Sequence, residues 1–193
     1  MAASVKVPYF TLICLSWLTL NPCAADTATP PPAYQLAAHQ ARVPPAVLYA
    51  IALQESGTDI GDRHIPWPWT LNIVGQPRRF MNREAACAEL HNALDTEPVR
   101  RIDVGLGQIN IGYHAQRVTQ PCDLLDPYQN LAIAATILRE QYKPSGGWLA
   151  AAGSYHRPAG GRPAERYRHS IHQRLSGIQG GSEALAASQE GSP

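Results

Sequence analysis

The chain has 193 residues and a formal net charge of +1, from 16 lysines and arginines against 15 aspartates and glutamates. This length fits one ordinary domain with tails and argues against two full domains. The near-neutral charge argues against a dedicated nucleic-acid-binding protein, and a hydrophobic content of 45% is too high for general disorder.

The first 25 residues have the composition of a secretory signal peptide. A single lysine, Lys6, precedes an uncharged and largely apolar run over 9–20, and Cys23-Ala24-Ala25 provides a small-residue ending. The apolar run is shorter than the roughly 20 residues that cross a bilayer. We therefore expect cleavage after Ala25, a periplasmic protein, and no membrane span in the mature chain; an uncleaved N-terminal anchor is the alternative.

The cysteine count agrees with export. Once Cys14 and Cys23 leave with the signal peptide, Cys87 and Cys122 remain. An even pair in an exported chain favours one disulfide over two free buried thiols. The chain has no Cys-x-x-Cys motif, and the helical pair His169 and His172 has no carboxylate or cysteine set near it, so we expect no metal ion and no other cofactor.

Apolar residues at helical spacing predict one mainly α-helical domain with a small β element, an α+β fold. We place this domain at 33–175, after a Pro/Thr-rich linker over 26–32 and before a Gly/Ser/Ala/Gln-rich tail over 176–193 that we expect to be disordered. The predicted helices cover residues 33–43, 46–56, 82–94, 148–155 and 164–175, with one more that begins after Asp126.

Local signals set several boundaries. Asp126-Pro127-Tyr128-Gln129 has the order of an N-cap, a first helical residue and a capping-box partner. Gly57 is expected to cap the end of the second predicted helix. Residues 58–81, rich in Gly, Pro and Trp, are expected to be irregular apart from a short strand over 70–74. Residues 102–111 predict a strand that runs into a tight loop.

Glu55 lies in the last turn of the second predicted helix, which is otherwise almost entirely apolar and must be buried on most sides. A carboxylate there faces the negative end of the helix dipole, and burial penalises its charged form further. Both effects raise the pKa and keep the acid protonated near neutral pH, which is the state that a general acid needs. A solvent-facing glutamate at a frayed helix end is the alternative.

Four short motifs follow one another along the chain. Residues 52–57 hold a glutamate-serine motif, 105–110 a Gly-Leu-x-Gln-Ile turn, 126–131 a helix start with a core asparagine, and 154–156 an aromatic motif. Together and in this order they resemble the motifs of lysozyme-like lytic transglycosylases. The insert over 67–72 and the run over 103–106 are similar to those of small transglycosylases that serve type IV secretion, conjugation and integrating conjugative elements.

The resemblance implies cleavage of the β-1,4 bond between N-acetylmuramic acid and N-acetylglucosamine in the glycan strand of peptidoglycan. Glu55 would protonate the glycosidic oxygen, and the N-acetyl group of the substrate would stabilise the oxocarbenium-like centre. The Glu55 carboxylate would then take the proton of the C6 hydroxyl, which closes a 1,6-anhydro ring without consuming water.

The resemblance also implies a set of substrate-binding residues. Gln108 and Asn110 would bond sugar hydroxyls and the N-acetyl group, Tyr155 would direct its hydroxyl toward the acetamido group or the acid, and Ser56 stands beside the acid. Each has a structural alternative: the amides only hold the turn, the tyrosine belongs to the core, and the serine closes the helix end. Asn130 matches a family position with a structural role.

The chain departs from the family pattern in several places, among them Arg157-Pro158 in place of smaller residues and the lack of the serine that the family often has before its Gly-Leu turn. Gly107 stands where methionine is commoner, which removes a flexible apolar wall, and His156 stands where asparagine is usual. Trp67 and Trp69 either stack on sugar faces or pin their insert to the core.

Two other functions compete with this interpretation. Asp59 or Asp103 would be the second carboxylate of a hydrolytic muramidase on the same fold, although such acids more often cap backbone or pair with arginine. A non-catalytic glycan-binding module of a secretion apparatus is the other, and the buried Glu55 argues against it. The arginines over 157–174 form either a solvated face or a contact for anionic wall polymer or for a secretion or conjugation protein.

Overall fold

The computed structural model of the chain describes Met1 and residues 28–143 and 146–189. Apart from Met1, the expected signal peptide over 1–25 lies outside the described residues. The same holds for the first two residues of the expected linker and for residues 190–193.

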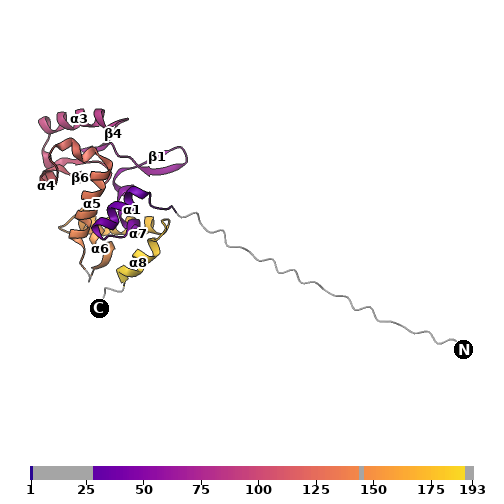
Figure 1. Ribbon diagram of the computed structural model, residues 1–193. Coiled ribbons are helices and arrows are strands. Elements are labelled where there is room, and N and C mark those ends of the chain that lie inside the picture. The colour runs from indigo at the N-terminus through magenta and orange to yellow at the C-terminus, as the bar shows by residue number, and fades with distance from the viewer. Residues whose placement is uncertain (2–27, 144–145, 190–193) are drawn as a thin grey trace.

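Helices dominate the described chain. The longer ones are α1 (Pro32–Ala41), α2 (Pro45–Ser56), α3 (Arg83–Thr96), α5 (Pro127–Gln141), α6 (Gly147–His156), α7 (Arg162–Leu175) and α8 (Gly181–Gln189). Short helical turns are α4 (Ile111–His114), η1 (Val99–Arg101), η2 (Ala115–Arg117) and η3 (Pro121–Leu125). Figure 1 shows α3 and strands β1 and β4 at one end of the molecule, α6, α7 and α8 toward the other, and α5 between them. The predicted mainly α fold with a small β element is confirmed.

Helix α2 forms the centre of the core. Pro45 occupies its first turn, where the missing N–H costs nothing, and every residue from Ala46 to Leu53 is buried. It packs against α1, α5, α6, α7 and α8. Because neighbouring elements cover the helix, its C-terminal end is held in one position. The backbone of Glu55, which lies in the last turn, is held in place with it.

Gly57 occupies the C-cap position of α2, as expected, but not in a left-handed conformation. Its φ is −56° and its ψ is 140°, and the chain continues directly into strand β1 (Gly57–Ile60). A Cβ at this position would collide with the Leu53 carbonyl oxygen and with the His64 ring. Glycine is therefore required here by close packing and not by backbone conformation.

Two small antiparallel sheets follow α2. Strand β1 pairs with β2 (Arg63–Pro66), and a second sheet has the order β4-β3-β5-β6, formed by β3 (Thr70–Ile73), β4 (Gln76–Arg79), β5 (Ile102–Val104) and β6 (Ile109–Asn110). The predicted strand over 70–74 is confirmed as β3. The expectation of irregular structure was wrong for β1, β2 and β4, because these short strands are mostly exposed and hold their place by hairpin pairing rather than by an alternating apolar face.

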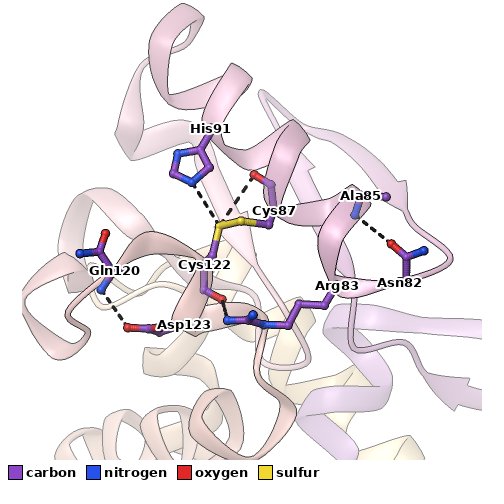
Figure 2. Close-up of a disulfide and its surroundings, with 8 residues drawn as sticks. All are labelled: Asn82, Arg83, Ala85, Cys87, His91, Gln120, Cys122 and Asp123. Carbon is purple, nitrogen blue, oxygen red and sulfur yellow. Dashed lines mark hydrogen bonds between the residues drawn. A yellow bond between two sulfur atoms is a disulfide. The ribbon is translucent and has the colours of Figure 1, made fainter.

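The predicted disulfide between Cys87 and Cys122 is present. Cys87 comes from α3 and Cys122 from η3, with Cα atoms 5.4 Å apart and 35 positions between them in the sequence. Figure 2 shows Arg83 beside the bridge, where its guanidinium donates a hydrogen bond of 2.9 Å to the Cys122 carbonyl oxygen. Together these contacts fasten α3 to the segment that leads into α5.

The expectation of a disordered tail over 176–193 does not hold for residues 176–189. Residues 176–189 are described, and they include α8, which packs on α6. Ile178 and Ala184 are buried, and Ala28 forms a parallel bridge with Ile178. The Gly/Ser/Ala-rich composition concealed the few apolar residues that attach this segment to the domain.

We expect replacement of both Cys87 and Cys122 by serine to lower the free energy of unfolding by roughly 3–4 kcal/mol, because the unfolded chain regains the freedom of a closed loop. Urea unfolding followed by circular dichroism measures this. His91→Ala is the matched control, since it removes the His91 contact to the Cys122 sulfur and keeps the disulfide. An unchanged midpoint in the double variant would contradict the prediction.

Candidate active site

A cleft of about 840 Å³ lies between the end of α2 and the sheet. Glu55 lies at the end of α2, strands β3 and β5 contribute Asn72 and Asp103, and α6 contributes Tyr155 and His156. The turn before β6 adds Gln108, β6 adds Asn110, and α4 adds Tyr113 and His114. Helices α2 and α6 and the strands between them therefore bring their polar side chains to one cavity.

Glu55 is half-buried, and its carboxyl group accepts a hydrogen bond of 2.6 Å from the Tyr167 hydroxyl. Burial raises the pKa of Glu55 to about 7, the Tyr167 hydrogen bond acts in the opposite direction, and the charge of Asp103 adds to the increase. A substantial fraction of Glu55 is therefore protonated at neutral pH. The sequence-based expectation of a raised pKa agrees with this environment.

Tyr167 is the partner of Glu55 that the sequence did not reveal. It lies on α7, 112 positions after Glu55, in a segment whose arginines and histidines had drawn the attention. The His156 ring stacks on the Tyr167 ring, with centroids 4.5 Å apart and planes 5° from parallel. The one available signal was the position of Tyr167 on the apolar face of α7 with Ile171. A hydrogen bond over such a separation has no local pattern.

Asn130 of α5 holds the turn that carries Gln108. Its side-chain oxygen accepts from the Gly107 N–H at 2.8 Å, and its amide nitrogen donates to the carbonyl oxygens of Val104 and Leu124 at 2.9 and 2.8 Å. The residue is 1% exposed, so these bonds satisfy an amide that would otherwise be buried at a cost. Asn130 therefore has the structural role that was expected for it: it holds the backbone of this turn.

Gly105 and Gly107 leave no space for side chains in this turn. Gly105 has a φ of 81°, which favours glycine. A Cβ at Gly107 would lie 2.7 Å from the Ala134 Cβ and 2.9 Å from the Tyr155 hydroxyl oxygen. Glycine thus stands where methionine was expected because α5 and α6 approach the turn too closely for a larger residue.

Ser56 does not reach the cleft, which corrects its expected substrate contact. The residue is fully buried, with its hydroxyl 3.0 Å from the Ala52 carbonyl oxygen and 2.8 Å from that of Leu106. Its hydrogen bond joins the end of α2 to the turn with Gln108. Ser56 therefore positions these two elements relative to each other.

The three remaining expected sugar contacts line the cleft while bonding to protein groups. The Gln108 amide nitrogen donates to the carbonyl oxygens of Gly105 and Thr70 at 2.9 and 3.2 Å. The Tyr155 hydroxyl donates to the Gly107 carbonyl oxygen at 2.6 Å rather than to Glu55. Asn110 caps α4 by accepting from the Gly112 N–H at 3.1 Å. Their contact with sugar stays a prediction.

Asp103 and Asp59, the two candidates for a second carboxylate, have different positions. Asp103 lines the cleft and accepts hydrogen bonds from the side-chain amides of Asn72 and Asn110 at 3.0 and 2.8 Å. Burial raises the pKa of Asp103, and these two hydrogen bonds act against that increase. Asp59 is exposed on β1 and pairs with His64 at 2.7 Å. Asp103 is therefore the second acid of the cleft.

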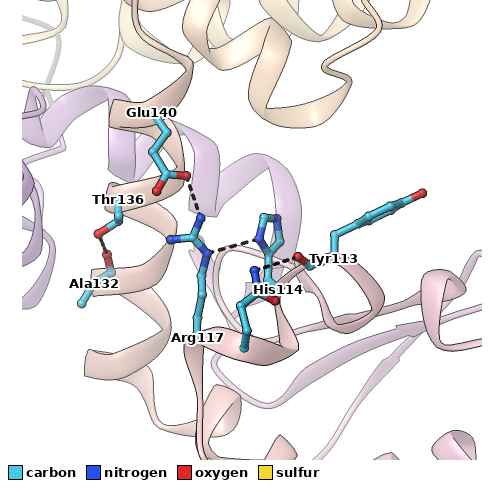
Figure 3. A network of polar contacts seen from close by, with 7 residues as sticks. Tyr113, His114, Arg117, Ala132, Thr136 and Glu140 are labelled. Atoms are coloured by element: carbon cyan, nitrogen blue, oxygen red, sulfur yellow. Dashed lines mark hydrogen bonds and ion pairs between the residues drawn. The ribbon is translucent and has the colours of Figure 1, made fainter.

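Tyr113 forms part of the cleft rim. Its ring is 59% exposed, and the Arg100 guanidinium lies 5.4 Å from the ring centre. Figure 3 shows Arg117 beside the neighbouring His114, with a hydrogen bond of 2.7 Å to Glu140 on α5. This ion pair connects the short helices after the turn to the core helix.

The two tryptophans of the insert pack against each other. The Trp67 and Trp69 rings are edge-to-face with centroids 5.7 Å apart, and the Trp67 N–H donates to the Phe80 carbonyl oxygen at 2.7 Å. Neither lines the cleft. The core-pinning alternative therefore describes them.

Within the described ranges, one group of three side chains has the spacing of metal ligands: Cys87, His91 and Cys122. Both cysteine sulfurs are joined in the disulfide, so neither is a thiolate. Among the same residues, no helix has the length and apolar content needed to cross a bilayer.

A carboxylic acid at the end of a buried helix, facing a polar cleft beside a small antiparallel sheet, defines a lysozyme-like glycan-cleaving enzyme. Residues 32–170 match the transglycosylase SLT domain, and the chain belongs to this family. It is a lytic transglycosylase, a glycosidic bond lyase whose substrate is peptidoglycan, and it acts outside the cytoplasm. No curated protein and no solved structure matches the chain.

We expect Glu55→Gln to stabilise the folded protein at pH 8 and to change little at pH 4. The pKa of about 7 in the folded state exceeds the ordinary value of 4.5, so the folded state binds the proton more tightly and loses stability as pH rises through this interval. Because the carboxyl group is half-buried, the expected gain at pH 8 is only about 1–2 kcal/mol.

Thermal unfolding at the two pH values measures this effect. Glu165→Gln, at an exposed position on α7, is the matched control and should change little at either pH. An equal gain at pH 4 and pH 8 for Glu55→Gln would show that ionisation of Glu55 is not the cause.

Proposed function

We propose that Glu55 is the single acid and base that cleaves the β-1,4 bond between N-acetylmuramic acid and N-acetylglucosamine. The observation that carries this proposal is a half-buried carboxyl group with a pKa of about 7 in the polar cleft, held by the Tyr167 hydroxyl. Such a group is populated in both protonation states at neutral pH, as a residue that first gives and then takes a proton must be.

The reaction proceeds in two proton transfers. The Glu55 carboxylic acid protonates the glycosidic oxygen while the bond from that oxygen to C1 of the muramic acid breaks. The acetamido carbonyl oxygen of the same sugar stabilises the positive charge at C1. The Glu55 carboxylate then takes the proton of the C6 hydroxyl as its oxygen bonds to C1, so the acid is restored and no water is consumed.

Gln108, Asn110 and Tyr155 are the proposed sugar contacts. Both donor contacts of the Gln108 amide go to backbone carbonyls, so its side-chain oxygen is the group that it offers to a sugar hydroxyl. Tyr155 holds the backbone of the same turn, and Asn110 caps α4 beside it. Substrate would thus bind a surface whose shape is set before it arrives.

We further propose that the protein reaches the periplasm through the signal peptide over 1–25 and opens the cell wall locally for a secretion or conjugation apparatus. Support comes from the composition of the N-terminal residues, from the insert over 67–72 and from the disulfide, which is typical of oxidising compartments.

A hydrolytic muramidase is the second candidate, and one observation favours it. Asp103 supplies a second carboxylate in the cleft, and hydrolytic glycosidases use two. In that reaction, water rather than the C6 hydroxyl would attack C1.

Digestion of purified peptidoglycan with residues 26–193, followed by mass spectrometry of the muropeptides, separates these functions. We expect products one water lighter than hydrolytic ones, and a rate reduced about 10²–10⁴-fold in Glu55→Gln because the proton donor is lost. Glu165→Gln should retain the rate. Reducing ends would support the muramidase, and no turnover by the native chain would support a glycan-binding module.

We expect kcat/KM to fall above about pH 7, where free Glu55 loses its proton. In Tyr167→Phe the decrease of kcat/KM should begin at higher pH. The Tyr167 hydrogen bond favours the carboxylate form of Glu55, so its loss raises the pKa of Glu55. Rates of anhydro-muropeptide release between pH 5 and 9 test this. Tyr128→Phe, at an exposed position on α5, is the control; an unchanged profile in Tyr167→Phe would refute the assignment.

A further inference from the structure

The cleft contains a polar pair that the proposed reaction does not use. Asn72 lies on β3 and Asp103 directly opposite on β5, since the two residues are partners in the antiparallel register. The Asn72 amide nitrogen donates to one carboxylate oxygen of Asp103 at 3.0 Å, and Asn110 donates to the other at 2.8 Å. All three residues line the cavity that holds Glu55.

Asp103 presents hydrogen-bond acceptors to the cleft. The Asn72 side-chain oxygen does not, because this atom is enclosed by the protein; Asn72 acts on the cleft through its amide nitrogen, which holds one carboxylate oxygen of Asp103. Asp103 keeps free lone pairs on both oxygens after accepting the two amides. A ligand group that suits this place is a hydrogen-bond donor.

The substrate carries a suitable donor next to the reacting carbon. The acetamido group at C2 directs its carbonyl oxygen toward C1 in the proposed reaction, and its N–H then projects from the opposite side of the same planar group. A carboxylate that accepts this N–H increases the electron density of the carbonyl oxygen and stabilises the positive charge that the acetamido group takes up.

We propose that Asp103, oriented by Asn72 and Asn110, accepts the acetamido N–H of the muramic acid whose bond is broken. This inference rests on the proposed function, because it assigns a substrate contact within that reaction. The influence of the Asp103 charge on the pKa of Glu55 agrees with the closeness of the two acids in one cavity.

The closing experiment measures binding and needs no turnover. The probe is a synthetic tetrasaccharide of two peptidoglycan repeats, compared with an analogue in which an ester oxygen replaces the acetamido N–H of each muramic acid. Calorimetric titration uses the mature chain with Glu55→Gln, which cannot cleave either probe if Glu55 is the acid. We expect the amide probe to bind about 10-fold or more tightly than the ester probe.

In the double variant Glu55→Gln with Asp103→Asn, the preference for the amide probe over the ester probe should fall to less than about 3-fold, since the charged acceptor is lost. Addition of Asp59→Asn, the other acid considered for the reaction, should leave the preference intact because Asp59 is exposed on β1 and absent from the cleft lining. Equal affinity of the Glu55→Gln protein for both probes would overturn the proposal. An equal loss for both probes in Asp103→Asn would also overturn it, since it would indicate a structural role alone.

A second measurement keeps the test valid if Asp103→Asn fails to fold. The tetrasaccharide labelled with ¹⁵N in its acetamido groups, bound to Glu55→Gln, should show a downfield proton shift for the muramic acid N–H. An unshifted signal would overturn the proposal. Failure of the proposed function is seen separately, as absence of anhydro products from the native chain, and does not affect either binding readout.

Discussion

The burial of α2 is the constraint on which the cleft depends. Helices on all its sides leave the residues from Ala46 to Leu53 without freedom to shift or rotate, so Glu55 is delivered to one place. The same burial raises the pKa of Glu55, and the protein accepts a destabilising acid at the end of its central helix in exchange for a proton donor. Position and acidity of the proposed catalytic group thus have one cause.

The opposite wall of the cleft is held in place by hydrogen bonds between side chains and the backbone of the turn with Gln108. Ser56 bonds the Leu106 carbonyl, Asn130 bonds the Gly107 N–H, and Tyr155 bonds the Gly107 carbonyl. The turn with Gln108 is therefore attached to α2, α5 and α6 at once. Such a turn is preorganised. Its glycines, Gly105 and Gly107, leave the space that lets α5 and α6 approach so closely.

The sequence could predict what depends on local patterns: the apolar α2, the Asp126 cap, the disulfide and the raised pKa of Glu55. It could not predict the hairpins before α3, whose exposed strands lack periodicity, or α8, whose apolar residues are few. For Ser56, the sequence offered both a substrate contact and closure of the helix end, and the hydrogen bond to the Ala52 carbonyl agrees with the second; its bond to Leu106, 50 positions away, had no local pattern. Tyr167 was missed because contacts between distant segments leave no spacing to detect.

The separation of 112 residues between Glu55 and Tyr167 has a consequence for the growing chain. A chain still emerging from the ribosome contains the acid long before it contains the hydroxyl that bonds to it. Helix α7 must be made and must pack beside α2 before this hydrogen bond can form. The environment that sets the pKa of Glu55 is therefore a property of the finished fold and of no earlier, shorter chain.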